Sequence, residues 1–209
     1  MSTVLVLTSS ALGRASVSNQ LVQDAVTQLV LQDLDLRVIT RDLGGNPIPH
    51  LTIDSARALR GAEPENAAQA VARSLSDELI AELKAADTLV IGAPMYNFGI
   101  ASTLKTWFDY VLRAGITFKY NESGPVGLLK GKRAIVIETR GGLYSEGPAQ
   151  VMDSQEPHLR NLLSFIGITN VKFFRAEKLA FGPEARAQAV NVASGQITEA
   201  IQKEFLEAV

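Results

Sequence analysis

Cysteine is absent from this sequence of 209 residues, and histidine occurs only twice. The lack of cysteine excludes a disulfide framework, a thiolate zinc site, an iron–sulfur cluster and a cysteine nucleophile. Two histidines without an H-x-x-x-H spacing do not make a histidine-rich metal site. We therefore expect neither a bound metal nor a cysteine-based mechanism.

Long apolar runs and an excess of positive charge are also missing. No apolar run approaches the roughly 20 residues that a membrane span requires. The short run from Val4 to Leu7 lacks the basic flank and the cleavage site of a secretory signal. The net charge of −2 provides no basic field for nucleic acid or anionic lipid. We therefore expect a cytoplasmic protein that binds neither membranes nor nucleic acid.

The length and composition fit one folded domain. A chain of roughly 200 residues buries a core without help from disulfides or metals. Hydrophobic residues make up 46% of the chain and charged residues 20%, which is ordinary for a globular protein. Because repeats, low-complexity tracts and an obvious linker are missing, we expect a single domain over residues 1–209.

Strand-like and helix-like segments alternate along the chain. The predicted strands are short apolar runs, and the predicted helices carry apolar residues at helical spacing. This alternation predicts a parallel sheet with helices on both faces, because right-handed crossovers join parallel neighbours. Turn-rich stretches are expected at 42–52 and, with room for a short hairpin, at 118–132. Strands are expected at 4–8, 36–40, 88–92, 133–139 and 171–175, and helices at 18–31, 67–84, 102–115, 157–166 and 183–208.

A hydroxyl-rich loop follows the first predicted strand and leads directly into a helix. It reads Thr-Ser-Ser-Ala-Leu-Gly-Arg-Ala-Ser-Val-Ser-Asn over residues 8–19. Unpaired N–H groups and the positive end of the helix dipole favour an anion at such a helix start. A role as N-cap explains one serine, Ser16 or Ser18, but not all four. The loop therefore favours phosphate binding.

Two further turns follow the third and fourth predicted strands. The apolar run from residue 88 stops at Pro94, and an aromatic and amide turn follows that can lie against a flat ring. The alternative is that these side chains only plug the end of a core strand. After the fourth strand, Gly141 and Gly142 permit close approach of backbone to a ligand, or simply form a tight turn.

These turns, after the first, third and fourth strands, converge at one edge of a sheet of order 2-1-3-4-5. Open α/β sheets bind ligands outside the carboxyl ends of their strands, and a flavodoxin-like sheet of this order binds FMN at its switch point. We therefore expect an α/β, flavodoxin-like three-layer sandwich with a five-stranded parallel sheet. One pocket would use all three turns.

Other nucleotide-binding and hydrolase motifs are absent or incomplete. No G-x-G-x-x-G follows the first strand, and Gly131-Lys132 lacks the flanking residues of a P-loop. No G-x-S-x-G nucleophile elbow is present, and the S-x-x-K from Ser102 to Lys105 lacks its companion motifs. A Rossmann NAD site, a P-loop and a serine hydrolase are therefore not expected.

The chain resembles the FMN-dependent NADH azoreductases, also described as NADH:quinone oxidoreductases, over nearly its whole length. The resemblance rests on the first strand with its serines and on several later segments together. It implies an enzyme that transfers two electrons from NADH through FMN to quinones and aromatic azo compounds by a ping-pong mechanism. It also implies a homodimer with active sites at the interface. The later segments are 76–84, 93–98, 113–118, 140–142, 147–148 and 165–168.

The same resemblance implies which residues bind FMN, while no residue is assigned as catalytic acid or base. The hydroxyl-rich loop would hold the phosphate, the turn after the third strand the ring and ribityl groups, and the turn after the fourth strand the pyrimidine end. An aromatic wall would stack on the nicotinamide or the acceptor. These residues are, in that order, Ser10, Ser16, Val17 and Ser18; Met95, Tyr96, Asn97 and Phe98; Thr139, Arg140, Gly141 and Gly142; and Tyr120 and Phe165.

Two other functions fit the same fold. A flavodoxin-like electron carrier or FMN-binding module would bind FMN but would not oxidise NADH. A phosphate-ester hydrolase would bind no flavin, and it needs a nucleophile that the sequence does not offer. Bleaching of the flavin absorption by NADH separates the enzyme from the carrier.

Overall fold

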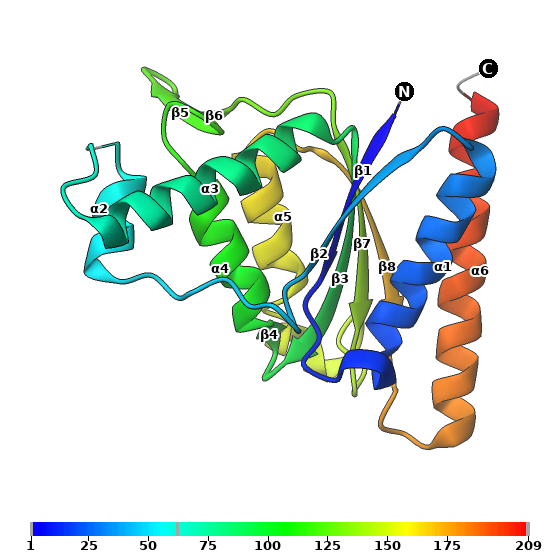
Figure 1. The fold of residues 1–209 in the computed structure, drawn as a ribbon. Coiled ribbons are helices and arrows are strands. Elements are labelled where there is room, and N and C mark those ends of the chain that lie inside the picture. Colours follow the sequence, from blue (N-terminus) through cyan, green and yellow to red (C-terminus); the bar gives the residue numbers. More distant parts are fainter. Residues whose placement is uncertain (1, 62, 208–209) are drawn as a thin grey trace.

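Five parallel strands form the central sheet, in the spatial order β2-β1-β3-β7-β8 (Figure 1). The predicted order 2-1-3-4-5 is therefore confirmed. The computed structural model describes residues 2–61 and 63–207, with side chains as far as residue 203. The strands are β1 (Thr3–Thr8), β2 (Arg37–Asp42), β3 (Thr88–Tyr96), β7 (Arg133–Thr139) and β8 (Asn170–Ala176).

Helices cover both faces of the sheet, which gives three layers (Figure 1). Two long helices lie on one face, and three helices with a short neighbour lie on the other. Apolar side chains alternate along the strands, so each face has its own core. Val4 and Val6 of β1 belong to one core, and Leu5 and Leu7 to the other. The first face carries α1 (Val17–Gln32) and α6 (Pro183–Glu207), and the second carries α2 (Ile53–Leu59), α3 (Ala67–Ala85), α4 (Ser102–Val111) and α5 (Glu156–Phe165).

The structure differs from the predicted elements at three places. The third strand extends to Tyr96, because Pro94 stays in register beside Thr139 of β7 and the strand end pairs with β4 (Gly99–Ile100). The turn-rich stretch predicted at 42–52 is followed directly by helix α2. A capping box between Thr52 and Ser55 holds the first turn of this helix. This short helix was not predicted.

The helix predicted to end near Gly115 ends earlier, at Val111. The hydroxyl of Thr117 accepts a hydrogen bond from the N–H of Arg113 at 2.9 Å and donates to the carbonyl of Val111 at 2.7 Å. These bonds close a tight turn that ends the helix, and Gly115 adopts a φ of 80° within it. The hairpin expected in the following stretch is present as β5 (Phe118–Asn121) and β6 (Gly124–Gly127).

Over residues 2–61 and 63–207, the helices include none that combines the length and the hydrophobicity needed to cross a membrane.

The loop after β2 packs directly under the loop after β1. Gly44 lies so close to Ser10 that a Cβ at residue 44 would stand 2.1 Å from the Ser10 carbonyl oxygen. Glycine is therefore required here by close approach of two backbones. The hydroxyl-rich loop rests on this contact.

We expect Gly44→Ala to lower the free energy of unfolding by about 1–3 kcal/mol, because the added methyl group must displace backbone. Urea unfolding of the variant and the wild-type protein measures this difference. Gly195→Ala is the control, because Gly195 lies in α6 with open space at its Cβ position. That change should stabilise the protein by up to about 1 kcal/mol. Equal stability of Gly44→Ala and wild-type protein would contradict the packing argument.

Candidate functional site

A cavity of about 240 Å³ lies at the carboxyl ends of the strands. The loops after β1 and β7 and the carboxyl end of β3 contribute to its wall. The loop after β8 and the first turn of α6 complete it. The lining residues are Ser10, Leu12, Ala15, Ser16 and Val17; Pro94, Met95 and Tyr96; Thr139, Arg140 and Gly141; and Leu179, Ala180 and Arg186.

The hydroxyl-rich loop is held against the end of β3 by Tyr96. The Tyr96 hydroxyl lies 3.3 Å from Ser10 Oγ and accepts a hydrogen bond from the N–H of Ala11 at 3.1 Å. The hydroxyl of Ser9 donates to the carbonyl of Gly92 at 2.8 Å. These hydrogen bonds give the loop a defined position over the sheet edge.

Ser16 is the N-cap of α1. Its Oγ accepts a hydrogen bond from the N–H of Asn19 at 3.2 Å and lies 2.9 Å from Ser18 Oγ. This cap leaves the N–H groups of Val17 and Ser18, in the first turn, without an intrahelical acceptor, as at every helix start. Ser16 and Val17 line the cavity, whereas the Ser18 side chain is buried behind them.

The carboxyl end of β3 lines the cavity, and the turn that follows it does not. Met95 and Tyr96 line it, whereas Asn97 and Phe98 form the tight turn into β4 with φ values of 49° and 71°. Such left-handed conformations of residues other than glycine cost of the order of 1 kcal/mol or more each. The Phe98 ring is exposed at its outer side and contacts Tyr144 edge-on, with 6.0 Å between ring centroids.

The turn after β7 divides its residues between the cavity and the protein interior. Thr139 and Gly141 line the cavity, and Gly142 lies just outside it beside Tyr144. The carbonyl of Gly141 accepts a hydrogen bond from the N–H of Ala180 at 3.0 Å, which joins this turn to the loop after β8. Gly141 therefore lies where backbone can meet a ligand at the cavity wall, and Gly142 does not.

Arg140 contributes to the cavity wall, but its guanidinium is completely buried among acceptors from several elements. It donates to Glu138 at 2.7 Å, to Gln155 at 2.9 Å and to Glu177 at 3.2 Å, and it forms an ion pair with Asp153 at 3.0 Å. These partners belong to β7, to the start of α5 and to the loop after β8. The guanidinium is therefore a structural group, and its turn presents backbone to the cavity.

Gln155 extends this cluster to β3. Its side-chain oxygen accepts from Arg140, and its side-chain nitrogen donates to the carbonyl of Ala93 at 2.7 Å. Ala93 immediately precedes the Pro94 turn. One fully buried glutamine thus joins the ends of β3 and β7, two neighbouring strands whose ends both contribute to the cavity wall.

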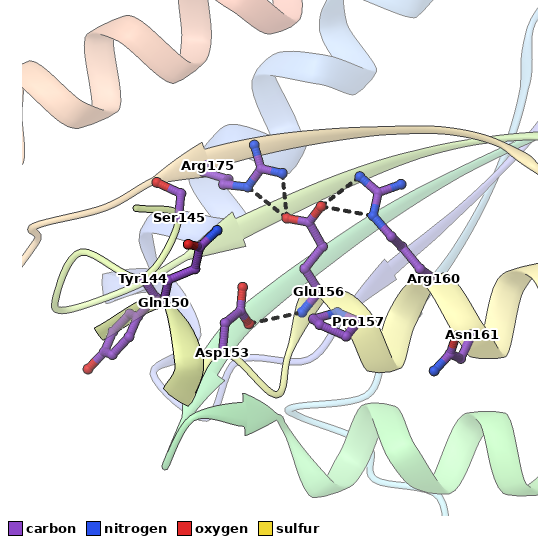
Figure 2. A pocket seen from close by; sticks show the side chains of 9 residues that line it. All are labelled: Tyr144, Ser145, Gln150, Asp153, Glu156, Pro157, Arg160, Asn161 and Arg175. Atoms are coloured by element: carbon purple, nitrogen blue, oxygen red, sulfur yellow. Dashed lines mark hydrogen bonds and ion pairs between the residues drawn. The ribbon is translucent and has the colours of Figure 1, made fainter. Parts of the chain in front are cut away.

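A second, larger cavity of about 480 Å³ borders this cluster (Figure 2). The carboxylate of Glu156 lies between two arginines. It accepts hydrogen bonds from Arg160 at 2.6 Å and from Arg175 at 2.7 Å. Burial raises the pKa of Glu156, but the hydrogen bonds and the charges of both arginines together lower it by more. The pKa of Glu156 is therefore below its ordinary value. The arginines of this cavity are therefore neutralised within the protein.

Glu138 differs from its neighbours because it is fully buried and one of its oxygens, Oε1, has no hydrogen-bond partner among the described residues. Burial raises the pKa of Glu138 from 4.5 to about 8, against the opposing attraction of Arg140. With Glu138 neutral, three guanidinium groups face three carboxylates, so the charges balance. The guanidinium groups are those of Arg140, Arg160 and Arg175, and the carboxylates are those of Asp153, Glu156 and Glu177.

Tyr120 and Phe165 lie away from the cavity. Tyr120 is in the β5–β6 hairpin, and Phe165 ends α5, at the opposite end of the sheet (Figure 1). Phe118 joins them, with ring centroids 5.7 Å from Tyr120 and 4.5 Å from Phe165. Tyr120 is 69% exposed. These rings form one aromatic group that does not meet the cavity of the same chain.

Sequence reasoning missed Leu179, Ala180 and Arg186. They follow β8, the edge strand, whose loop carries no glycine pair and no run of hydroxyls that would draw attention to it. The predicted topology could have indicated them, because the loops after all parallel strands of one sheet leave from the same edge, where ligands bind.

The chemistry of the cavity fits a ligand with a flat apolar body and an anionic end. Leu12, Pro94, Met95 and Leu179 supply apolar surface. Hydroxyls, the first turn of α1 and Arg186 also line the cavity, and their donors and positive charge suit a phosphate.

Known proteins with similar sequences were found by comparison. Residues 2–201 match the model of a family described by its flavodoxin-like fold. An FMN-dependent NADH:quinone oxidoreductase of Hyphomonas neptunium is 56% identical over 202 residues, 97% of each chain. One from Escherichia coli O157:H7 is 50% identical over 198 residues, 94% of this chain and 97% of that one.

A solved structure of similar fold was also found. The FMN-dependent NADH-azoreductase from Bacillus anthracis, in complex with FMN, superposes with a TM-score of 0.88 at 25% identity, covering 97% of this chain and 99% of that one.

The raised pKa of Glu138 predicts a specific pH dependence of stability. Between pH 4.5 and about 8 the folded state keeps a proton that the unfolded state has released. The stabilisation is therefore full below pH 4.5 and is lost as the pH rises through about 8. Glu138→Gln removes this proton. The free energy of unfolding of the wild-type protein should fall relative to the variant with rising pH, by at most about 1.4 kcal/mol per pH unit.

Urea unfolding across this pH range measures the difference. The matched control is Glu146→Gln, which makes the same change on an exposed side chain. If wild-type protein and Glu138→Gln gave parallel curves of stability against pH, Glu138 would not hold the proton.

Proposed function

The chain belongs to the FMN-dependent NADH:quinone oxidoreductase and azoreductase family of the flavodoxin-like fold, and on this premise we propose that its 240 Å³ cavity is the FMN site of such an enzyme. The observation that carries the proposal is the meeting of the loops after β1 and β7 with the carboxyl end of β3 in one cavity. Its apolar and hydroxyl-bearing walls match the two ends of FMN.

The proposed contacts follow from the lining. Ser10, Ser16 and the N–H groups of Val17 and Ser18 would hold the phosphate. Met95 and Tyr96, continued by Asn97 and Phe98, would lie along the ring and ribityl groups. The backbone of residues 139–142 would reach the pyrimidine end, because the Arg140 guanidinium is occupied by carboxylates.

FMN, when bound, supplies the redox chemistry: it accepts two electrons from NADH and passes them to quinones or aromatic azo compounds. The contribution of the protein is to bind, to orient and to set the local charge. Backbone N–H groups of the Asn97 and Gly141 turns would stabilise negative charge on the ring. No side chain of the cavity is assigned a proton-transfer step.

NADH and the acceptor would occupy the same place beside FMN in turn, which gives ping-pong kinetics. The edge-on pair of Phe98 and Tyr144 supports an aromatic ligand near this place. We place the enzyme in the cytoplasm, and we expect residues 1–209 to act as one domain.

The aromatic wall is proposed to come from a second copy of the chain. Tyr120 and Phe165 lie at the opposite end of the sheet from the cavity, so they would stack on a ligand only across a homodimer interface. The exposure of Tyr120, unusual for a tyrosine packed on Phe118, supports this role.

The function is tested by adding FMN to the purified protein, removing free flavin, and then adding NADH without oxygen. We expect retained FMN and rapid loss of its visible absorption. Steady-state rates with NADH and a quinone should give parallel double-reciprocal lines. Retained FMN that NADH fails to bleach would indicate the electron carrier, and intersecting lines would contradict the shared place for donor and acceptor.

The dimer is tested separately. Sedimentation should give twice the mass of one chain, and Tyr120→Ala should raise KM for a quinone while leaving FMN affinity at the wild-type value, because the tyrosine would contact only the acceptor. Val151→Ala, which also truncates an exposed side chain, is the control. A monomer that retains full quinone reductase activity would rule out the interface site.

A further inference from the structure

We propose that Arg186 supplies the positive charge of the anion end of this cavity and binds the phosphate of FMN. The inference rests on the proposed function and adds to it a residue that sequence analysis did not select. It concerns discrimination between a phosphorylated flavin and an unphosphorylated one.

The position of Arg186 follows from the packing of α6 on α1. The two helices run side by side in the same direction on one face of the sheet (Figure 1). Ser194 Oγ donates to a carboxylate oxygen of Asp24 at 3.1 Å, which fixes their register. Arg186 precedes Ser194 by two turns and Ser16 precedes Asp24 by about the same distance. The first turn of α6 therefore lies beside the first turn of α1, and both Ser16 and Arg186 line the cavity.

The start of α6 is set rigidly enough to hold this side chain there. The N–H of Arg186 donates to the carbonyl of Gly182 at 3.0 Å, which closes the first helical turn. Gly182 has a φ of 114°, a conformation that favours glycine, and Pro183 follows as the first residue of the helix. The loop and the helix start thus fix the backbone at Arg186, which lines the cavity.

The charge of Arg186 is available to a ligand. Among the described residues, its exposed guanidinium has no hydrogen bond and no ion pair, and the lining of the cavity contains no carboxylate. The guanidinium of Arg140, which also lines the cavity, is in contrast neutralised by the carboxylates of Asp153 and Glu177. The remaining polar groups of the wall are neutral hydroxyls. Arg186 is therefore the source of net positive charge in the wall.

A phosphate monoester is the ligand chemistry that this arrangement suits. It carries close to two negative charges at neutral pH, and the planar guanidinium can donate to two of its oxygens at once. Serine hydroxyls and helix N–H groups can position these oxygens without adding charge. The contribution of Arg186 should therefore appear for FMN and be absent for riboflavin, which has the same ring but no phosphate.

The test compares the dissociation constants of FMN and riboflavin, measured by quenching of flavin fluorescence, for wild-type protein and Arg186→Gln. We expect the variant to bind FMN roughly twofold to fivefold more weakly, as for an exposed charge pair, and to bind riboflavin with unchanged affinity. Arg186→Lys should retain part of the FMN affinity. Added salt should weaken FMN binding to wild-type protein more than to Arg186→Gln.

Arg37→Gln is the matched control, because it removes the same charge from an exposed side chain at the amino end of β2. It should bind both flavins as the wild-type protein does. Equal FMN affinity of Arg186→Gln and wild-type protein would overturn the inference, and so would equal weakening of FMN and riboflavin, which would indicate packing. If wild-type protein bound neither flavin, the proposed function itself would be wrong.

Discussion

The buried guanidinium of Arg140 is the interaction on which the shape of the cavity depends. It joins the end of β7 to the start of α5 and to the loop after β8, and through Gln155 it reaches the end of β3. A charge buried in this way is tolerated only because carboxylates and an amide satisfy it on every side. The turns that form the cavity wall are therefore positioned by a group that does not itself face the ligand.

Charge is distributed unequally on the two sides of the residue 139–142 turn. Beneath it, guanidinium groups and carboxylates balance once Glu138 holds its proton. In the cavity, neutral hydroxyls and the guanidinium of Arg186, which has no partner in the described part of the chain, leave a net positive charge. Balanced charge gives a rigid frame without attracting an anion, and unbalanced charge gives affinity for one. The two arginines of the wall, Arg140 and Arg186, thus have opposite uses.

The walls of the cavity are held in place by contacts within the protein. Tyr96 holds the hydroxyl-rich loop, Gly44 supports it from below, and the turn at Asn97 and Phe98 keeps two left-handed residues in place. Such strained backbone persists only where the surroundings determine it, and it is typical of ligand-binding turns. Preorganised loops of this kind reduce the conformational entropy that binding must otherwise remove.

The sequence by itself determined the order of strands and helices and the three turns that carry Ser16, Pro94 and Gly141. These features depend on apolar periodicity and on the residues within each turn, which are local properties. Only the tertiary structure decided that the Arg140 side chain points into a carboxylate cluster, and that Arg186 faces the cavity. The partners of these arginines come from elements far apart in the chain, so their directions depend on how the packed layers meet.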